Sequence, residues 1–115
     1  MNKDNVLKWV EALESGKYQQ GFGTLNSKNE TFCCLGVACE VAILNGVELR
    51  KEKNVNGLFY YNGNPSTLPC AVQKWLDIDV GVGNPSVGGK SLASLNDKFE
   101  VSFEVIAKEI RKEWL

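Results

Sequence analysis

Three cysteines lie close together in the stretch FCCLGVACE (residues 32–40), and cysteine can bind a metal or act as a nucleophile. A zinc site usually combines cysteines two to four residues apart with a second such pair or with histidines. Here Cys33 and Cys34 are adjacent, Cys39 follows later, Cys70 lies apart, and the chain contains no histidine. Because adjacent cysteines point in different directions, they chelate one ion poorly, and we expect no metal site.

The same cysteines bear on whether the protein is an enzyme. A catalytic thiol needs a histidine or another base that stabilises its thiolate, so the lack of histidine excludes a Cys–His dyad. A thiol at Cys34 activated by the N-terminus of a following helix remains an open alternative. Free cysteine is a small hydrophobe that is usually buried, so we interpret the stretch as core packing, with Gly36 allowing another element to approach. Phosphate-binding loops, dinucleotide fingerprints and nucleophile elbows are also missing. We therefore predict a protein that is not an enzyme and that uses no cofactor.

A second stretch carries residues suited to binding a nucleotide. Residues 17–21, KYQQG, combine a cation, an aromatic ring, two amides and an open backbone. Nucleobases stack on aromatic rings, phosphates take hydrogen bonds from cations or backbone amides, and base edges pair with amides or carboxylates. The candidate ligand-binding residues here are Lys17, Tyr18, Gln20 and Gly21. The alternatives, a solvated Lys17 and a half-buried strand position for Tyr18, stay open.

Four residues elsewhere complete the candidate set. Arg50 could contact a phosphate. Neighbours in a strand point to opposite faces, so one of Tyr60 and Tyr61 would be exposed, and we select Tyr61. Asn96 and Asp97 add an amide and an acid that could pair with a guanine edge. Their alternative role is to cap or turn the chain before the last helix.

Composition limits the classes of protein and partner. The chain has 115 residues, 43% hydrophobic and 23% charged, which fits one globular domain over residues 1–115. The net charge of −1 argues against binding duplex DNA or RNA but permits a small anionic ligand. No run approaches the roughly 20 apolar residues that a membrane helix needs, and the N-terminus does not resemble a signal peptide. We expect a cytoplasmic protein with reduced cysteines.

The elements that position these residues are predicted to form an α+β fold, a small antiparallel sheet packed by three to four helices. Residues 3–15 show helical spacing, with Leu7 on the apolar face and Trp9 at its edge. Residues 17–25 and 30–34 flank four turn-forming residues and predict a β-hairpin. A buried helix follows over residues 34–45.

The second half of the chain alternates short elements with turns. We predict two short strands within residues 49–61, a short helix opened by Leu68-Pro69, and a loop or loose hairpin over residues 80–89. Residues 91–97 could form one helical turn. The last helix begins after Ser102 as its cap, with apolar residues at i, i+3, i+4, i+7 and i+11.

The order of short motifs resembles a widespread family of small tailed-phage proteins. The motifs span residues 15–110: SGKYQQGFGTL, FCCLGVACE, LPCAVQKWL, SLASLND and SFEVIAKEI. This family is identified as the anti-CBASS sponge family, whose members sequester cyclic dinucleotide defence signals without cleaving them. The resemblance implies a homo-oligomer that binds a cyclic dinucleotide, such as cyclic GMP-AMP, near subunit interfaces in the cytoplasm of the infected bacterial host. The segments 49–64 and 80–90 match no motif, which puts the ligand preference in doubt.

Three functions are therefore compared below. The first is a phage immune-evasion protein that sequesters a cyclic dinucleotide. The second is a phage protein that blocks a host protein by direct binding. The third is a nucleotide-degrading enzyme, which the lack of histidine and of metal-ligand clusters disfavours.

Overall fold

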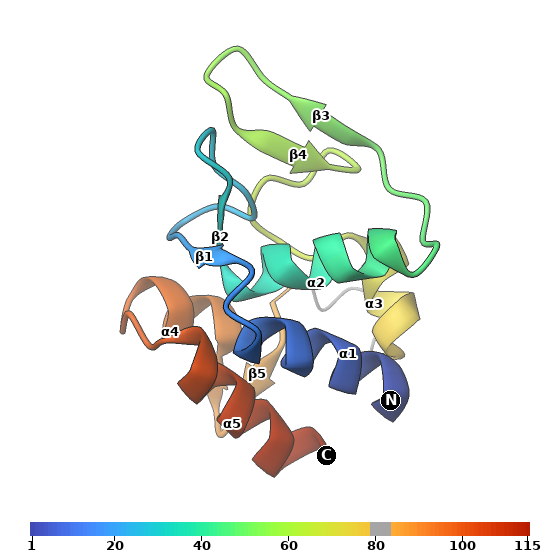
Figure 1. The fold of residues 1–115 in the computed structure, drawn as a ribbon, viewed down its shortest axis with the longest axis vertical. Helices are drawn as coiled ribbons and strands as arrows, with labels where there is room; N and C mark the ends of the chain where they lie inside the picture. Colours follow the sequence, from blue (N-terminus) through green and yellow to red (C-terminus); the bar gives the residue numbers. More distant parts are fainter. Residues whose placement is uncertain (79–83) are drawn as a thin grey trace.

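The computed structural model describes residues 1–78 and 84–115, and in it three long helices form a stack with short strands beside and above them (Figure 1). These residues form five helices and three two-stranded sheets, which confirms the predicted α+β class. Five helices replace the expected three to four because the predicted helical turn at residues 91–97 is a separate helix. The expected single sheet is divided into three small pieces.

The bounds of the elements follow the predicted segments closely, except in the first strand pair. The helices are α1 (Lys3–Glu14), α2 (Cys34–Leu44), α3 (Cys70–Leu76), α4 (Leu92–Asp97) and α5 (Phe103–Trp114). The strands are β1 (Gln19–Gln20), β2 (Thr31–Phe32), β3 (Lys51–Lys53), β4 (Phe59–Tyr61), β5 (Ser86–Val87) and β6 (Lys90–Ser91). Within the described part of the chain, no helix has the length and apolar character required to cross a membrane.

Helix α1 lies between α2 and α5 and packs against both (Figure 1). The Asn2 side chain caps its start by accepting a hydrogen bond from the Asn5 N–H. Because two helices cover α1, its buried face is wider than one stripe, and it includes Trp9, which is fully buried instead of lying at the edge. Leu7, predicted on the apolar face, is 36% exposed.

The predicted β-hairpin over residues 17–34 is wrong in its pairing. Strand β1 pairs with β2 in parallel, with Gln19 opposite Thr31. The turn itself forms, since the Glu30 N–H donates to the Ser27 carbonyl and Asn26 pairs antiparallel with Phe32. The predicted extended run of residues 17–25 is interrupted at Gly23, whose φ is +84°, so the residues after Gly23 do not continue β1.

Helix α2 is buried on nearly all sides, as its mostly apolar composition predicts; Glu40 is the one charged residue within it. At Gly36 the helix lies directly against the backbone of the segment before the Ser27 turn. A Cβ added at Gly36 would overlap the Leu25 carbonyl group. The glycine in the cysteine-rich stretch therefore allows this close approach, as predicted.

Caps define the later helices. Pro69 immediately precedes α3, and the Ser91 and Ser102 side chains accept hydrogen bonds from the first turns of α4 and α5. The cap at Ser102 confirms the prediction for the last helix. Of the predicted loop at residues 80–89, residues 80–83 lie outside the described residues, and the remainder joins the β5–β6 hairpin.

Strands β3 and β4 confirm the two strands predicted within residues 49–61. They form an antiparallel hairpin with Glu52 opposite Tyr60. The hairpin stands at one end of the molecule, beyond α2 and away from α1 and α5 (Figure 1). Its β3 side chains are exposed, whereas Tyr61 of β4 is fully buried in the core.

We predict that Gly36→Ala lowers the free energy of unfolding by about 3 kcal/mol, because the added methyl group forces backbone apart in a packed core. Gly46→Ala is the matched control, since Gly46 has a φ of +92° but open space around it. That variant should lose only about 1 kcal/mol from backbone strain. Urea denaturation measures both, and equal losses would contradict the steric explanation.

Candidate functional site

The Asn96 side chain joins three segments that are distant in the sequence. Its carbonyl oxygen accepts hydrogen bonds from the Gln20 amide at 2.9 Å and from the Cys34 N–H at 3.2 Å. Its amide nitrogen donates to the Gly21 carbonyl at 2.8 Å and to the Asp97 carboxylate at 2.7 Å. Asn96 is fully buried, so these bonds satisfy the amide inside the protein. The structure thus brings together four predicted site residues, but in a scaffold role.

The remaining polar groups of Cys34 also have partners within the core. The Trp9 indole N–H donates to the Cys34 carbonyl at 2.9 Å, and the Cys34 thiol donates to the Leu92 carbonyl at 3.4 Å. Cys33 is the residue before α2 and makes no side-chain cap, so Asn96 supplies an acceptor to the start of this helix. The cysteine-rich stretch is therefore a junction between α1, α2 and α4.

The three cysteines of this stretch are buried thiols. Burial raises the pKa of Cys33 to about 11, and it raises the pKa values of Cys34 and Cys39 as well. A thiol with a raised pKa stays protonated near neutral pH and is a poor nucleophile. Across residues 1–78 and 84–115, no three His, Cys, Asp or Glu side chains are grouped to hold a metal ion. These observations favour the packing interpretation over an activated Cys34.

Tyr61 belongs to a second buried network and not to an exposed stacking surface. Its hydroxyl donates to the Glu40 carboxylate at 2.6 Å and accepts from the Asn26 amide at 3.1 Å. Burial, and then the bond to Glu40, raise the pKa of the Tyr61 phenol. Lys51 pairs with the same carboxylate at 3.1 Å. Because Tyr61 is fully buried, its ring is not accessible to a ligand in this conformation.

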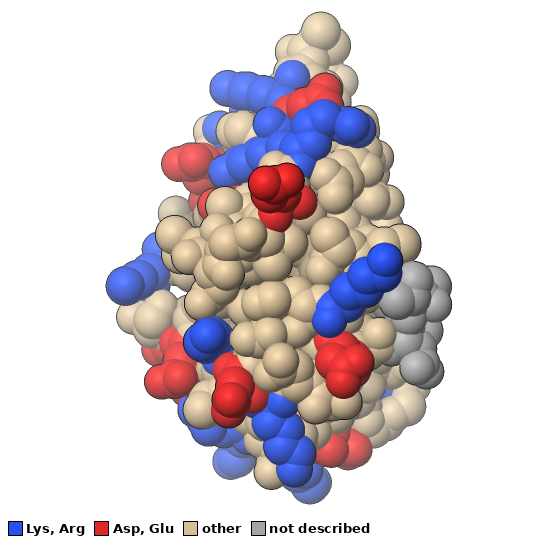
Figure 2. Space-filling view, turned by 90° about the vertical axis from the view of Figure 1, so that its right-hand side faces the viewer, with Lys and Arg blue, Asp and Glu red and all other residues tan. Residues whose placement is uncertain are grey.

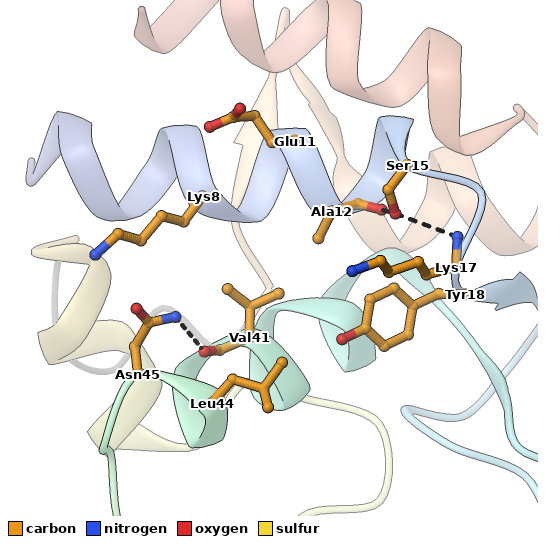
Figure 3. A pocket seen from close by; sticks show the side chains of 9 residues that line it. All are labelled: Lys8, Glu11, Ala12, Ser15, Lys17, Tyr18, Val41, Leu44 and Asn45. Carbon is orange, nitrogen blue, oxygen red and sulfur yellow. Dashed lines mark hydrogen bonds between the residues drawn. The ribbon is translucent and has the colours of Figure 1, made fainter.

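Lys17 and Tyr18 line an open groove of about 430 Å³ between α1 and α2 (Figure 3). Val41 and Leu44 of α2 form its apolar floor, and Figure 3 shows the Tyr18 hydroxyl directed over that floor. The volume is within the range of small-molecule sites, roughly 300–1,000 Å³. Of the candidate residues, Lys17 and Tyr18 share this groove, while Tyr18 and Gln20 also line a smaller hollow of about 250 Å³ beside the start of α5.

Lys8 and Asn45 also line this groove, and the sequence interpretation missed both. Lys8 reaches toward Asn45 at one end, while Lys17 enters from the other end beside Tyr18 (Figure 3). Helical spacing could have identified Lys8, because Lys8, Ala12 and Ser15 follow an i, i+4, i+7 pattern on α1. Asn45 was interpreted only as part of the helix end, where its amide donates to the Val41 carbonyl at 2.8 Å.

Two lysines, Lys8 and Lys17, and one acid, Glu11, line the groove, so its lining has one more positive than negative charge. Neither the Lys8 nor the Lys17 ammonium forms an ion pair with any residue in the described ranges. The Tyr18 ring is half-buried and contacts the Phe32 ring edge-on, with centroids 5.3 Å apart. Burial, with a smaller effect of the Glu40 carboxylate, raises the pKa of Tyr18, so its hydroxyl stays neutral. An anionic ligand with a flat apolar part would suit this arrangement.

Arg50 lies apart from the groove, on the β3–β4 hairpin. It forms an ion pair with Glu52, and both side chains are largely exposed. The eight candidate residues therefore divide among three places: the groove, the Asn96 cluster and the hairpin. They do not form a single site.

We predict that Asn96→Ala lowers the free energy of unfolding by about 2–3 kcal/mol, because it leaves the Gly21 carbonyl and the Cys34 N–H unpaired in the core. Asp97→Ala, at the partly exposed neighbour, should cost less than about 1 kcal/mol. Chemical denaturation measures both variants. A stable Asn96→Ala protein would contradict the scaffold role.

Cysteine labelling tests the packing interpretation of the thiols. We expect a maleimide at neutral pH to modify the exposed Cys70 rapidly and the buried Cys33, Cys34 and Cys39 only after unfolding. Peptide mass spectrometry of native and urea-unfolded samples locates the label. Rapid labelling of Cys34 in the folded protein would restore the activated-thiol alternative.

Comparison with known proteins places almost the whole chain in one family. No curated protein and no solved structure matches the chain. Residues 1–114 match a family model described as a domain of unknown function, DUF8296. The chain belongs to the DUF8296 family.

Proposed function

We propose that this protein binds a cyclic dinucleotide in the groove between α1 and α2 and sequesters it without cleavage. The observation that carries the proposal is the pair of unpaired ammonium groups, Lys8 and Lys17, at opposite ends of a groove with an aromatic wall. A cyclic dinucleotide has two phosphates on opposite sides of its ring and two bases with flat faces. Charge at both ends and an apolar, aromatic middle match that chemistry.

Tyr18 supports the stacking part of the proposal. Its ring is held in place by the edge contact with Phe32, so a base could stack on it with little loss of side-chain freedom. The Asn96 cluster supports it indirectly. By bonding Gln20 and Gly21, Asn96 anchors the chain two to three residues after Tyr18.

Sequestration is favoured over cleavage by the chemistry of the groove. Phosphodiester hydrolysis usually relies on metal ions or on a general base such as histidine. The chain has no histidine, and the Ser15 hydroxyl in the groove donates to the Ala12 carbonyl at 2.7 Å. The bound nucleotide would therefore leave the protein unchanged.

The biological setting of the proposal comes from the resemblance to tailed-phage proteins. In that setting the protein would reduce the free concentration of a defence signal in the cytoplasm of the infected bacterium. The proposal includes a homo-oligomer with ligand near the subunit interface. Leu44, at the groove floor, is 77% exposed, and a second copy of the chain could cover it.

We predict that cyclic GMP-AMP raises the melting temperature, because a ligand that binds the folded state stabilises it. Lys17→Ala and Lys8→Ala should each weaken binding about tenfold or more, since each removes a charge-assisted hydrogen bond. Tyr18→Ala should weaken it similarly, whereas Tyr18→Phe keeps the ring and should bind nearly as the native protein does. Isothermal titration calorimetry measures each affinity.

The matched control is Lys112→Ala, which removes an exposed lysine of α5 far from the groove and should not alter binding. Bound nucleotide is released by heating and identified by chromatography. Intact nucleotide is the expected result, while altered nucleotide would revive the enzyme alternative. Absence of a shift with every cyclic di- or trinucleotide tested would overturn the proposal and favour a protein target.

A further inference from the structure

The β3–β4 hairpin has an outer edge that no described segment covers. Hydrogen bonds alternate along an antiparallel pair, so the register identifies which backbone groups face outward. The Asn62 N–H donates to the Arg50 carbonyl, and the Asn54 N–H donates to the Leu58 carbonyl. These two bonds show which pairs along the hairpin are hydrogen-bonded to each other. Glu52 and Tyr60 form the hydrogen-bonded pair that lies between them.

Two further hydrogen bonds, made by β4, confirm which backbone groups face outward. The Phe59 N–H donates to the Asn26 carbonyl at 3.1 Å, and the Tyr61 N–H donates to the Asn64 carbonyl at 3.0 Å, so both point away from β3. Their partners in the register are Lys53 and Lys51. The N–H and C=O groups of these two lysines consequently point away from β4, and no described residue bonds to them.

The side chains along this edge are mostly cationic. Arg50, Lys51 and Lys53 lie beside one acid, Glu52, whereas the whole chain has a net charge of −1. Figure 2 shows Lys and Arg side chains gathered at the hairpin end of the molecule with a few acidic side chains among them, next to a broad surface that is mostly without charge. Cations therefore outnumber acids on the strand whose backbone is open, although Arg50 is paired with Glu52 and Lys51 with Glu40.

The lysines of β3 are held in fixed positions. The Lys51 ammonium lies 3.1 Å from the Glu40 carboxylate and 4.9 Å from the centre of the Phe59 ring. The Lys53 ammonium lies 5.7 Å from the centre of the same ring. Both lysines therefore lie on one face of the hairpin, as residues two apart in a strand must.

We infer that the open edge of β3 binds an extended, acidic segment of a partner protein, which adds to the hairpin as a further strand. Main-chain bonds to Lys51 and Lys53 supply affinity in this mode of recognition, and side chains supply specificity. Acidic residues directly opposite the two lysines gain charge pairing, and the intervening residue, opposite Glu52, is neutral or basic. The recognised pattern is thus acid, non-acid, acid.

A second copy of this chain is a poor occupant of the same edge. In an antiparallel pairing of two β3 strands centred on Glu52, Glu52 would face Glu52 and Lys51 would face Lys53. Like charges directly opposite each other destabilise a strand pair. Lysines on an edge strand generally oppose such self-association, which is consistent with an edge reserved for a partner of opposite charge.

The experiment uses the full chain and a probe peptide, acetyl-Val-Glu-Val-Glu-Val-amide, with acetyl-Val-Lys-Val-Lys-Val-amide as its charge-reversed control. Amide hydrogen exchange is followed by NMR at each residue of β3. We expect the acidic peptide at saturation to slow exchange of the Lys51 and Lys53 amides by about tenfold, because strand addition bonds them. The Glu52 amide, already bonded within the hairpin, should change little.

Two variants and a control sharpen the result. Lys53→Glu should abolish the protection by reversing the charge, and Lys112→Glu on α5 should leave it intact. Lys53→Pro should also abolish it, since proline removes an outward N–H and is tolerated on an edge strand. Equal protection by both peptides would overturn the charge preference. Changes in chemical shift without amide protection, if heparin causes them too, would indicate general anion binding and would contradict strand addition. The absence of any response to the acidic peptide would also overturn the proposal.

Discussion

The first turn of α2 lies wholly inside the protein, so every polar group there must find an internal partner. Asn96 of α4 accepts from the Cys34 N–H, Trp9 of α1 donates to the Cys34 carbonyl, and the Cys34 thiol donates to the Leu92 carbonyl. An unsatisfied buried group costs about 1–3 kcal/mol, so these bonds require the helices to meet in one arrangement. Close contact at Gly36 adds a steric requirement at the same place.

That junction also determines where the candidate groove lies. Asn96 bonds the chain at Gln20 and Gly21, two to three residues after Tyr18, while α1 lines one side of the groove and α2 its floor. Lys17 and Tyr18 thus line the groove, while Gln20 and Gly21, two to three residues further along, bond to Asn96. One short motif therefore contributes both to the buried junction and to the surface of the groove.

Charge is distributed unevenly over a chain that is almost neutral as a whole. Unpaired lysines flank the groove, and three cations lie along the hairpin around the open edge of β3. The two surfaces suit different partners. A concave groove can surround a small anion, whereas an open strand edge presents regularly spaced backbone groups to an extended chain.

The sequence by itself determined the positions of the helices, the Ser102 cap and the buried character of the cysteine stretch, because these depend on residues within one or two turns of each other. Residues 3–15 and 102–114 illustrate this, since apolar spacing and the Ser102 cap predicted both helices. Tertiary structure alone decided the parallel pairing of β1 with β2, the burial of Tyr61 and the scaffold role of Asn96. Each of these depends on contacts between residues that are far apart in the chain, such as the bonds from Asn96 to Gln20 and Cys34. No local pattern reports which of several polar residues will be enclosed when the helices pack, and so the groove beside Lys17 and Tyr18 emerged only with the fold.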